Sequence, residues 1–330
     1  MSQSKISQCT DRSKLDGDPE GLSRIDNNEL GIKQHEILVF SCVRNELSRL
    51  PYFFEYHRAL GANRFFVIDN ASTDGTTDFL LTQSDVHLFF TAASYAKSRC
   101  GVDWLNSLLA EFGTGYWTIT LDVDELLVYP GSESIKLQTL VNYLESENAE
   151  AVGTFLLDMY SDLPISKTDY IGGSSFIEIC KHFDGNTYLS RNDRGLPVRG
   201  GPRHRLFWQG KNRAKPPPVL TKYPLIRWRE GLSYTASTHI LPDVKLAQIS
   251  GVLLHFKLFS DFIKSCENEA KRNEHWDDAA QYKIYWEEVQ ANPDLTAYYE
   301  DSIAYTDSMQ LVKLRLMECP QAYLNYIAAQ

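Results

Sequence analysis

The sequence lacks the patterns by which several common classes of protein are recognised. The 330 residues contain six cysteines, but no two have the C-x-x-C spacing that is typical of zinc sites. No G-x-G-x-x-G or G-x-x-x-x-G-K-[ST] fingerprint is present, and this disfavours a dinucleotide-dependent dehydrogenase and a P-loop nucleotidase. Any nucleotide phosphates would therefore have to be bound by a metal ion or by basic side chains.

Long apolar runs and an excess of positive charge are also missing. No run approaches the roughly 18 apolar residues that a spanning helix needs, so we expect no integral membrane segment. The N-terminus has no apolar leader, and scattered cysteines fit reduced thiols, so the sequence predicts a cytoplasmic protein. A membrane-linked substrate would then require peripheral attachment. The net charge of −10 argues against a nucleic-acid partner.

The sequence does contain an alternation of strand-like and helix-like segments. Residues 1–35 are polar and aperiodic, and we predict that they form a mobile tail. Apolar strand-like segments then alternate with segments of helical spacing, and Gly61 is a stop signal for the first helix. The predicted strands cover residues 36–43, 64–69, 86–90, 116–121 and 151–160, and the predicted helices 47–60, 101–112 and 134–147. This alternation predicts an α/β sandwich of three layers with a mainly parallel sheet.

Polar clusters follow three of these strands: Arg44-Asn45-Glu46, Asp69-Asn70 and Asp122-Val123-Asp124-Glu125. Because ligands gather at the carboxyl ends of parallel strands, the clusters predict one polar crevice. Asp122 and Asp124 share a face if the chain is extended there, and a hard cation such as Mg²⁺ or Mn²⁺ would relieve their repulsion. The alternative is a solvated acidic turn.

The order and spacing of these three motifs resemble the family 2-like glycosyltransferases of GT-A fold, in their bacterial branch with an Asp-x-Asp motif. The segment from Gly251 to Lys257 adds to the likeness, which covers about residues 36 to 290. The chain departs from the pattern at Asn70, where many members carry an acid, and in lacking a recognisable Glu-Asp catalytic motif. The resemblance implies a GT-A-type catalytic domain at residues 36–260 and a helical extension at 261–330.

The resemblance also implies a function. A sugar would move from a nucleotide-sugar donor, UDP-linked, to a hydroxyl of a glycan, a lipid-linked or another acceptor, with inversion, in glycan or surface polysaccharide synthesis. Mn²⁺ or Mg²⁺ would be bound by Asp122, Asp124 and His255. The donor-binding residues that it implies are Arg44, Glu46, Asp69, Asn70, Asn106, Asp122 and Lys257.

An inverting transfer needs a base that accepts the proton of the acceptor hydroxyl. Asp158, at the end of the fifth predicted strand, is favoured over Glu230, and both stay candidates. Arg203 and Arg205 lie in a loop-rich region at 161–220, where they could bind phosphate or be solvated.

Some of these residues also have a purely structural interpretation. A histidine in an apolar segment, as His255 is, more often belongs to the core, and Arg44 could simply pair with Glu46. Rival functions are a non-catalytic nucleotide-sugar-binding protein and a haloacid-dehalogenase-like phosphatase. The phosphatase is disfavoured because several strands precede the Asp-x-Asp motif, whereas its nucleophile motif ends the first strand.

Overall fold

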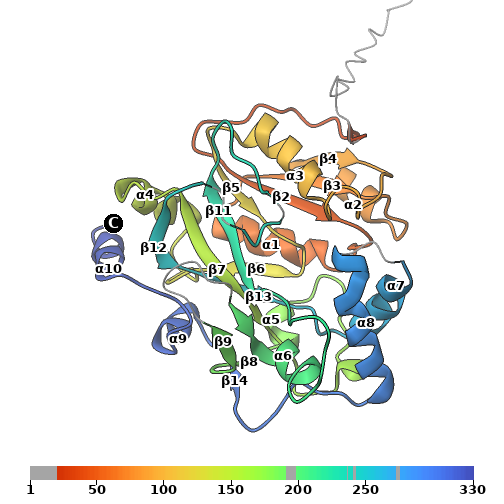
Figure 1. The fold of residues 1–330 in the computed structure, drawn as a ribbon. Coiled ribbons are helices and arrows are strands. Elements are labelled where there is room, and N and C mark those ends of the chain that lie inside the picture. The colour runs from red at the N-terminus through yellow and green to blue at the C-terminus, as the bar shows by residue number, and fades with distance from the viewer. Residues whose placement is uncertain (1–20, 191–197, 236, 241–242, 273–275) are drawn as a thin grey trace, which may run out of the picture.

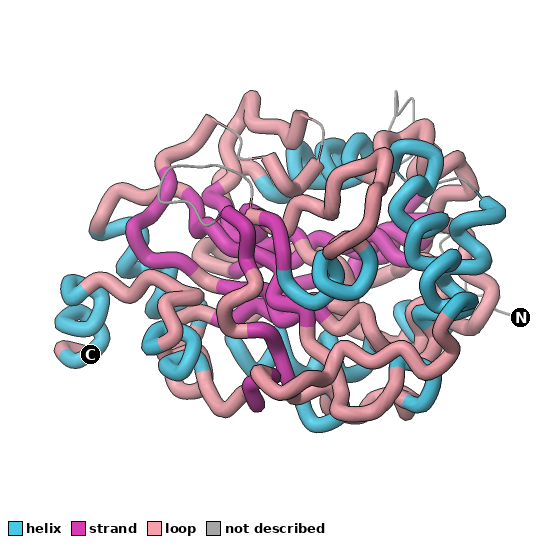
Figure 2. The backbone as a smooth tube through the Cα atoms, turned by 60° about the horizontal axis from the view of Figure 1, so that its bottom comes forward, coloured by secondary structure: helices cyan, strands magenta, loops and turns pink. Residues whose placement is uncertain are grey.

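The computed structural model of the chain describes residues 21–190, 198–235, 237–240, 243–272 and 276–330. In this part of the chain, one mixed sheet has the strand order β1-β4-β3-β2-β5-β11-β7-β13-β6, and β12 pairs with β7 beside this path. The sheet runs through the middle of the molecule with helices around it (Figures 1 and 2). Its strands are β1 (Ser23–Arg24), β2 (Ile37–Val43), β3 (Arg64–Asp69), β4 (Val86–Phe90), β5 (Trp117–Thr120), β6 (Glu125–Val128), β7 (Ala151–Asp158), β11 (Thr221–Arg227), β12 (Leu246–Ser250) and β13 (Val252–His255).

The first half of the sheet confirms the predicted alternation. Strands β4, β3, β2 and β5 are parallel neighbours, and each overlaps a predicted strand. Val39 on β2 belongs to the apolar core under α1, whereas Phe40 belongs to the core under α3 on the opposite face. Because both faces are covered, these strands read as continuous apolar runs rather than as alternating ones.

The helices are short and mostly follow strands. The predicted helices correspond to α1, α3 and α4, and α1 ends at Gly61, whose φ of 106° is the left-handed conformation that glycine adopts without strain. The helices are α1 (Leu50–Leu60), α2 (Thr76–Leu81), α3 (Val102–Leu108), α4 (Leu137–Ser146), α5 (Phe176–Ile179), α6 (Gly201–Phe207), α7 (Phe262–Arg272), α8 (Trp276–Ala291), α9 (Ser308–Lys313) and α10 (Gln321–Ala328). A π-helical turn, Leu109–Gly113, continues α3, and Ile165–Lys167 is a 3₁₀ turn.

The acidic segment adopts a turn rather than an extended chain. Strand β5 ends at Thr120, and β6 begins at Glu125 on the far edge of the sheet, where it pairs with β13. Asp122 and Asp124 lie in the connection between the two strands. The expectation that they share the face of one strand is therefore wrong, and Glu125 starts a new buried strand instead of trailing the old one.

Strand β11 was not predicted. It lies in the middle of the sheet, antiparallel to both β5 and β7. Pro224 interrupts the sequence pattern of this strand, and a proline normally argues against a central strand. The register with β7 shifts between Lys222 and Leu225, so the proline coincides with an irregularity of the ladder.

Segments near both ends of the chain pack against the central sheet and its helices. Of the predicted tail, residues 1–20 lie outside the described residues, while Ser23–Arg24 pairs with β4. After residue 260, α7 and α8 lie side by side, and Tyr323 of α10 is buried in the core next to Tyr143 of α4. Two small sheets complete the fold, β8 (His182–Asp184) with β14 (Ser302–Ala304) and β9 (Tyr188–Ser190) with β10 (Arg199–Gly200). In the described ranges no helix combines the length and apolarity needed to span a bilayer.

Candidate functional site

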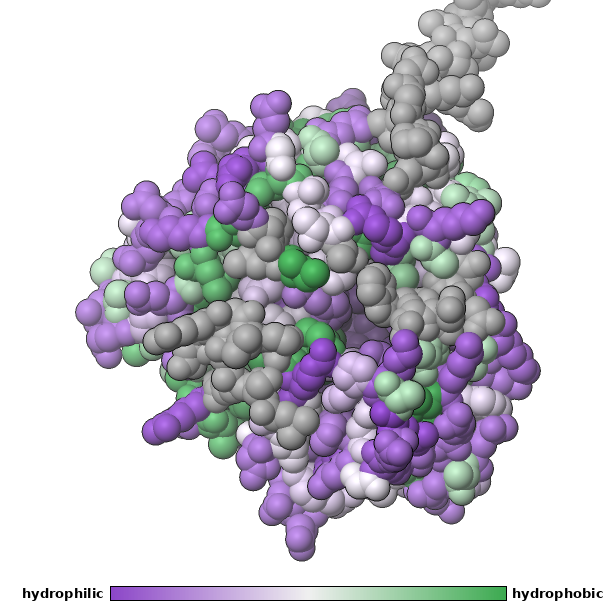
Figure 3. All heavy atoms as spheres, viewed as in Figure 1, coloured by the Kyte–Doolittle hydropathy of each residue, from purple (hydrophilic) through white to green (hydrophobic). Residues whose placement is uncertain are grey.

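A pocket of about 630 Å³ opens where the predicted crevice should be. Its walls come from the chain after β2, the turn at residues 121–124, the start of β11 and the end of β13, and α7 and α8 close the other side. Strand β11 runs antiparallel to its neighbours, so its first residues reach the edge at which the parallel strands end. The face of the molecule seen in Figure 3 is largely hydrophilic, with hydrophobic residues exposed in small groups.

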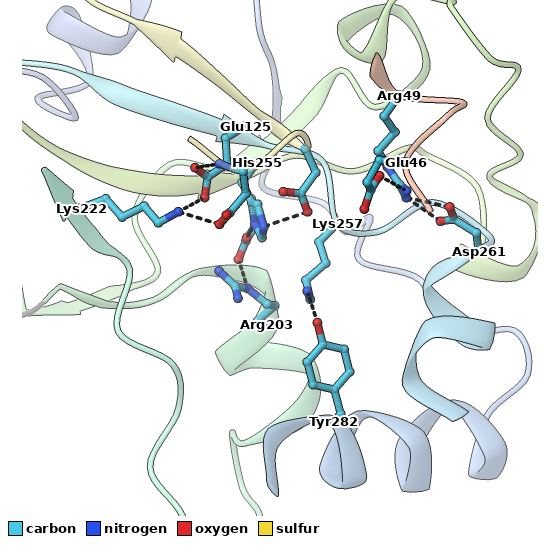
Figure 4. A network of polar contacts seen from close by, with 12 residues as sticks. Glu46, Arg49, Glu125, Arg203, Lys222, His255, Lys257, Asp261 and Tyr282 are labelled. Carbon is cyan, nitrogen blue, oxygen red and sulfur yellow. Dashed lines mark hydrogen bonds and ion pairs between the residues drawn. The ribbon is translucent and has the colours of Figure 1, made fainter. Parts of the chain in front are cut away.

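The site contains a set of seven interacting side chains, which we call the charged cluster: Asp122, Asp124, Glu125, Asp158, Arg203, Lys222 and His255 (Figure 4).

One half of the charged cluster is a chain of contacts through His255. The His255 Nδ1 atom lies 2.5 Å from Asp158 Oδ1, and Nε2 lies 3.3 Å from Asp124 Oδ2. Arg203 Nε donates to the other oxygen of Asp158 over 2.7 Å. Burial alone would raise the pKa of Asp158, but Arg203 and His255 hold it below its ordinary value. Asp158 thus orients the imidazole and is poorly suited to accept a proton.

The other half is organised by Lys222, which sequence reasoning missed. Its Nζ lies 2.7 Å from Asp122 Oδ2 and 2.5 Å from Glu125 Oε1, and its side chain is 4% exposed. Burial alone would lower the pKa of Lys222, but the two carboxylates raise it, so the ammonium stays charged. The two predicted acids therefore have different partners: Asp122 contacts Lys222, and Asp124 contacts His255.

The charged cluster contains a set of atoms that fits a divalent metal. One ligand atom each from Asp124, Glu125 and His255 can be chosen so that all lie within 4.8 Å of one another. Two carboxylate oxygens and one imidazole nitrogen suit Mn²⁺ better than Mg²⁺, which prefers oxygen ligands alone. Glu125 takes the place in this set that was predicted for Asp122, although its other contacts are to Lys222 and to the Asp122 amide.

The predicted donor residues after β2 and β3 are held by main-chain groups. Arg44 and Asn70 line the pocket. Arg44 donates to the Asn70 carbonyl over 2.8 Å, and the Asn70 side chain donates to the carbonyls of Thr91 and Ala93. The predicted alternative in which Arg44 pairs with Glu46 is not found, because Glu46 pairs with Arg49.

Asp69 lies just behind the pocket wall. It is fully buried, and its oxygens accept hydrogen bonds from the Ser72 amide and the Thr77 hydroxyl. Its carboxylate therefore holds its own loop together and does not line the pocket.

A second ionic group links the two walls of the pocket. Arg49 at the start of α1 lies 3.1 Å from Glu46 and 2.7 Å from Asp261, just before α7 (Figure 4). Burial raises the pKa of Glu46 to about 7, although Arg49 acts in the opposite direction. Lys257 points across the same space and donates to the Tyr282 hydroxyl of α8 over 2.9 Å.

Three further predicted residues do not line the pocket. The Asn106 side chain forms hydrogen bonds of 2.9 and 2.8 Å with the main chain of Tyr234, so it fixes a loop. Glu230, a candidate base, is exposed beyond the far end of β11 and does not line the pocket. Arg205 pairs with the buried Asp184 at 2.9 Å, so it is neither solvated nor in the pocket.

Comparison with known proteins points in the same chemical direction. No family model matches the chain. A stretch of 133 residues is 29% identical to a glycosyltransferase family 92 protein of Oryza sativa subsp. japonica; this is 38% of the present chain and 21% of that protein. The chain thus spans about a fifth of the length of this relative. The match supports a glycosyltransferase, but gives no support to the predicted placement in family 2 or its bacterial branch.

Proposed function

We propose that the chain is a metal-dependent glycosyltransferase of GT-A type that moves a sugar from a nucleotide-sugar donor to an acceptor hydroxyl, with inversion. The observation that carries the proposal is the charge pattern of the pocket. Six carboxylates line it, and each has a cationic or imidazole partner within 4 Å. Because its carboxylates are already compensated, the pocket can accept an anionic substrate.

Two cations of the pocket remain available for that anion. Within the described ranges, neither Arg44 nor Lys257 has a carboxylate in ion-pair distance; their hydrogen-bond partners are a carbonyl oxygen and a phenol hydroxyl. Arg44 stands on the wall formed by β2, and Lys257 follows β13 on the opposite side. A diphosphate between them could contact both, because arginine and lysine both bind phosphate oxygens.

The charged cluster supports the metal dependence. Asp124 and His255 would bind the ion, with Glu125 or Asp122 as a third ligand, and Asp158 would keep the His255 Nε2 atom directed at it. When bound, the ion supplies Lewis-acid stabilisation of the negative charge that develops on the departing nucleoside diphosphate. Lys222 pairs with both Glu125 and Asp122 and holds their carboxylates in place.

The test is a thermal-shift titration of the intact chain with UDP, GDP and other nucleoside diphosphates, with and without Mn²⁺. We expect one nucleotide to stabilise the chain strongly when Mn²⁺ is present, by about 2.7 kcal/mol at 100 times its Kd. Asp124→Asn should remove the Mn²⁺-dependent part. Asp78→Asn, a change at an exposed acid on α2, is the matched control and should leave the response unchanged.

Turnover then separates a transferase from a protein that only binds its ligand. Release of nucleoside diphosphate from the corresponding sugar nucleotides, in the presence of Mn²⁺, supports the transferase. Binding without release, with every donor and acceptor tried, favours the non-catalytic alternative. If Asp124→Asn binds Mn²⁺ and nucleotide as the unchanged chain does, the proposed metal site is wrong.

A further inference from the structure

His239 is a pocket residue that neither the sequence patterns nor the proposed metal site uses. It lies between β11 and β12 and lines the pocket together with Asp122 and Lys222. Its Nδ1 atom is 2.6 Å from the carbonyl oxygen of Thr221, the first residue of β11. The adjacent Tyr223 amide donates to the Thr238 carbonyl over 3.2 Å. These two contacts hold the imidazole directly beside the residue that organises half of the charged cluster.

The loop that carries His239 is fixed at a second place. Asn106 of α3 binds both the amide and the carbonyl of Tyr234, and the Tyr234 hydroxyl donates to the Tyr223 carbonyl over 3.1 Å. Tyr234 itself is buried at 1% exposure. Tyr234 is thus attached to both the sheet and α3.

The contact to Thr221 determines the tautomer of His239. A carbonyl oxygen only accepts hydrogen bonds, so Nδ1 must carry the proton. In the neutral ring, Nε2 is then an acceptor with a lone pair, and the side-chain hydrogen bond that His239 forms within the described part of the chain is the one at Nδ1.

The surroundings keep this ring neutral. Burial, followed by the nearby Lys222 ammonium, lowers the pKa of His239 to about 4. The charged groups that act on the ring are Lys222 on β11, Asp122 in the turn after β5, and Arg203 on α6.

The carboxylates of the pocket are already engaged in ion pairs, whereas the Nδ1 contact of His239 leaves its Nε2 atom available. Glu46 and Asp261 share Arg49, and Glu269 pairs with Arg272 over 3.3 Å. The three pocket acids of the charged cluster contact Lys222 or His255. Asp158, the base predicted from the sequence, is held by both Arg203 and His255. An inverting transfer needs a group that can take a proton from the acceptor.

We propose that His239 is this general base, an assignment that rests on the proposed function. As the acceptor oxygen forms its bond to the anomeric carbon, its proton passes to His239 Nε2. The bond from the anomeric carbon to the diphosphate oxygen breaks, and its electron pair leaves with the nucleoside diphosphate. The Nδ1–H···O=C contact to Thr221 keeps Nε2 directed at the acceptor and helps to accommodate the positive charge that the ring gains.

The test compares two substitutions at His239 with the unchanged chain. In His239→Asn the amide nitrogen can replace Nδ1 as donor to Thr221, so only the Nε2 position is lost. In His239→Ala the ring is removed and leaves space for added imidazole. The assay is the release of nucleoside diphosphate from the sugar nucleotide that the unchanged chain turns over, with water as acceptor, in the presence of Mn²⁺. His35→Asn, at an exposed histidine, is the control.

We expect kcat of His239→Asn to fall by about 10²- to 10⁴-fold, the range typical of a lost general base. Its affinities for Mn²⁺ and for the nucleoside diphosphate, measured by calorimetry, should stay within about twofold, and imidazole should restore part of the activity of His239→Ala. Should His239→Ala fail to fold, the result for His239→Asn decides alone.

Three outcomes overturn the assignment: equal turnover by His239→Asn and the unchanged chain, weakened Mn²⁺ binding, which would make His239 a metal ligand, or a raised KM with unchanged kcat, which would make it a donor contact. If the unchanged chain releases no nucleoside diphosphate from any donor, the proposed function itself is overturned, and this result differs from all three.

Discussion

Polar side chains are held in different ways on the wall after β2 and β3 and in the charged cluster. On the wall formed after β2 and β3, the polar side chains of Arg44, Asp69 and Asn70 bind backbone groups or a hydroxyl. In the charged cluster, by contrast, side chains compensate one another, with contacts such as Arg203 to Asp158 and Lys222 to Glu125. Contacts to the main chain fix a loop whatever occupies the pocket. Mutual compensation of charges instead leaves groups whose partners an incoming ion or phosphate can replace.

Two buried histidines extend the comparison. His57 on α1 packs against Phe53 under the first wall, and its Nε2 atom has no hydrogen-bond partner in the described part of the chain. Burial lowers its pKa to about 4. Burial alone would also lower the pKa of His255, but Asp124 and Asp158 raise it. The same side chain is therefore a neutral core residue in one region and a partner of carboxylates in the other.

The largest expected effect comes from breaking the compensation at Lys222. Lys222→Met removes the ammonium but leaves Glu125, which is 1% exposed, buried without its cation. We expect a loss of about 3–5 kcal/mol in the free energy of unfolding, measured by urea denaturation, because removing one partner of a buried ion pair is strongly destabilising. The double variant Lys222→Met/Glu125→Gln should recover part of this loss.

Lys167→Met is the control for this experiment. Lys167 is 66% exposed and 3.7 Å from Asp294, so its replacement should change stability by no more than about 0.5 kcal/mol. Equal effects of the Lys222 and Lys167 variants would contradict the view that the charged cluster depends on internal compensation.

The first wall could be predicted from the sequence because it is local. The apolar run of β2 leads directly into Arg44, and β3 leads directly into Asp69 and Asn70, so the strand pattern and the polar end occur in one short segment. The alternation of strands and helices placed these ends at one edge of a sheet. The sequence did not predict which of these residues would face the pocket. Asp69, for example, accepts hydrogen bonds from its own loop instead.

The charged cluster and His239 could be predicted only in part because they are assembled from distant segments. Asp124, Asp158 and His255 end recognisable strands or follow them, so the sequence singled them out, but their contacts with one another were not predicted. Lys222 lies 100 residues after Asp122 in the sequence, on a strand whose sequence pattern Pro224 interrupts. His239 lies in a loop without any periodic pattern. Whether these residues come together depends on the order of the strands in the sheet, which the local sequence does not encode.

The comparison of the two histidines predicts a pH effect at His57. Because the folded chain keeps His57 neutral, the unfolded chain binds more protons between its pKa of about 6.5 and the folded value of about 4. The contribution of this residue is therefore complete above pH 6.5 and is lost as the pH falls to 4. We expect His57→Leu to lose about 3 kcal/mol less than the unchanged chain between pH 7 and pH 4. Urea denaturation of both chains at each pH measures this, and parallel pH curves would contradict it.

The smallest expected effect is at Asp69, where the first wall can be tested against its predicted role in donor binding. Asp69→Asn keeps an acceptor for the Ser72 amide and offers an amide to the Thr77 hydroxyl, so we expect a loss of only about 1 kcal/mol in stability. Because the carboxylate is behind the wall, the Mn²⁺-dependent stabilisation by a nucleoside diphosphate should change less than twofold in apparent Kd, in contrast to Asp124→Asn. Loss of nucleotide binding with unchanged stability would instead make Asp69 a donor contact, and would mean that its loop rearranges when the nucleotide binds.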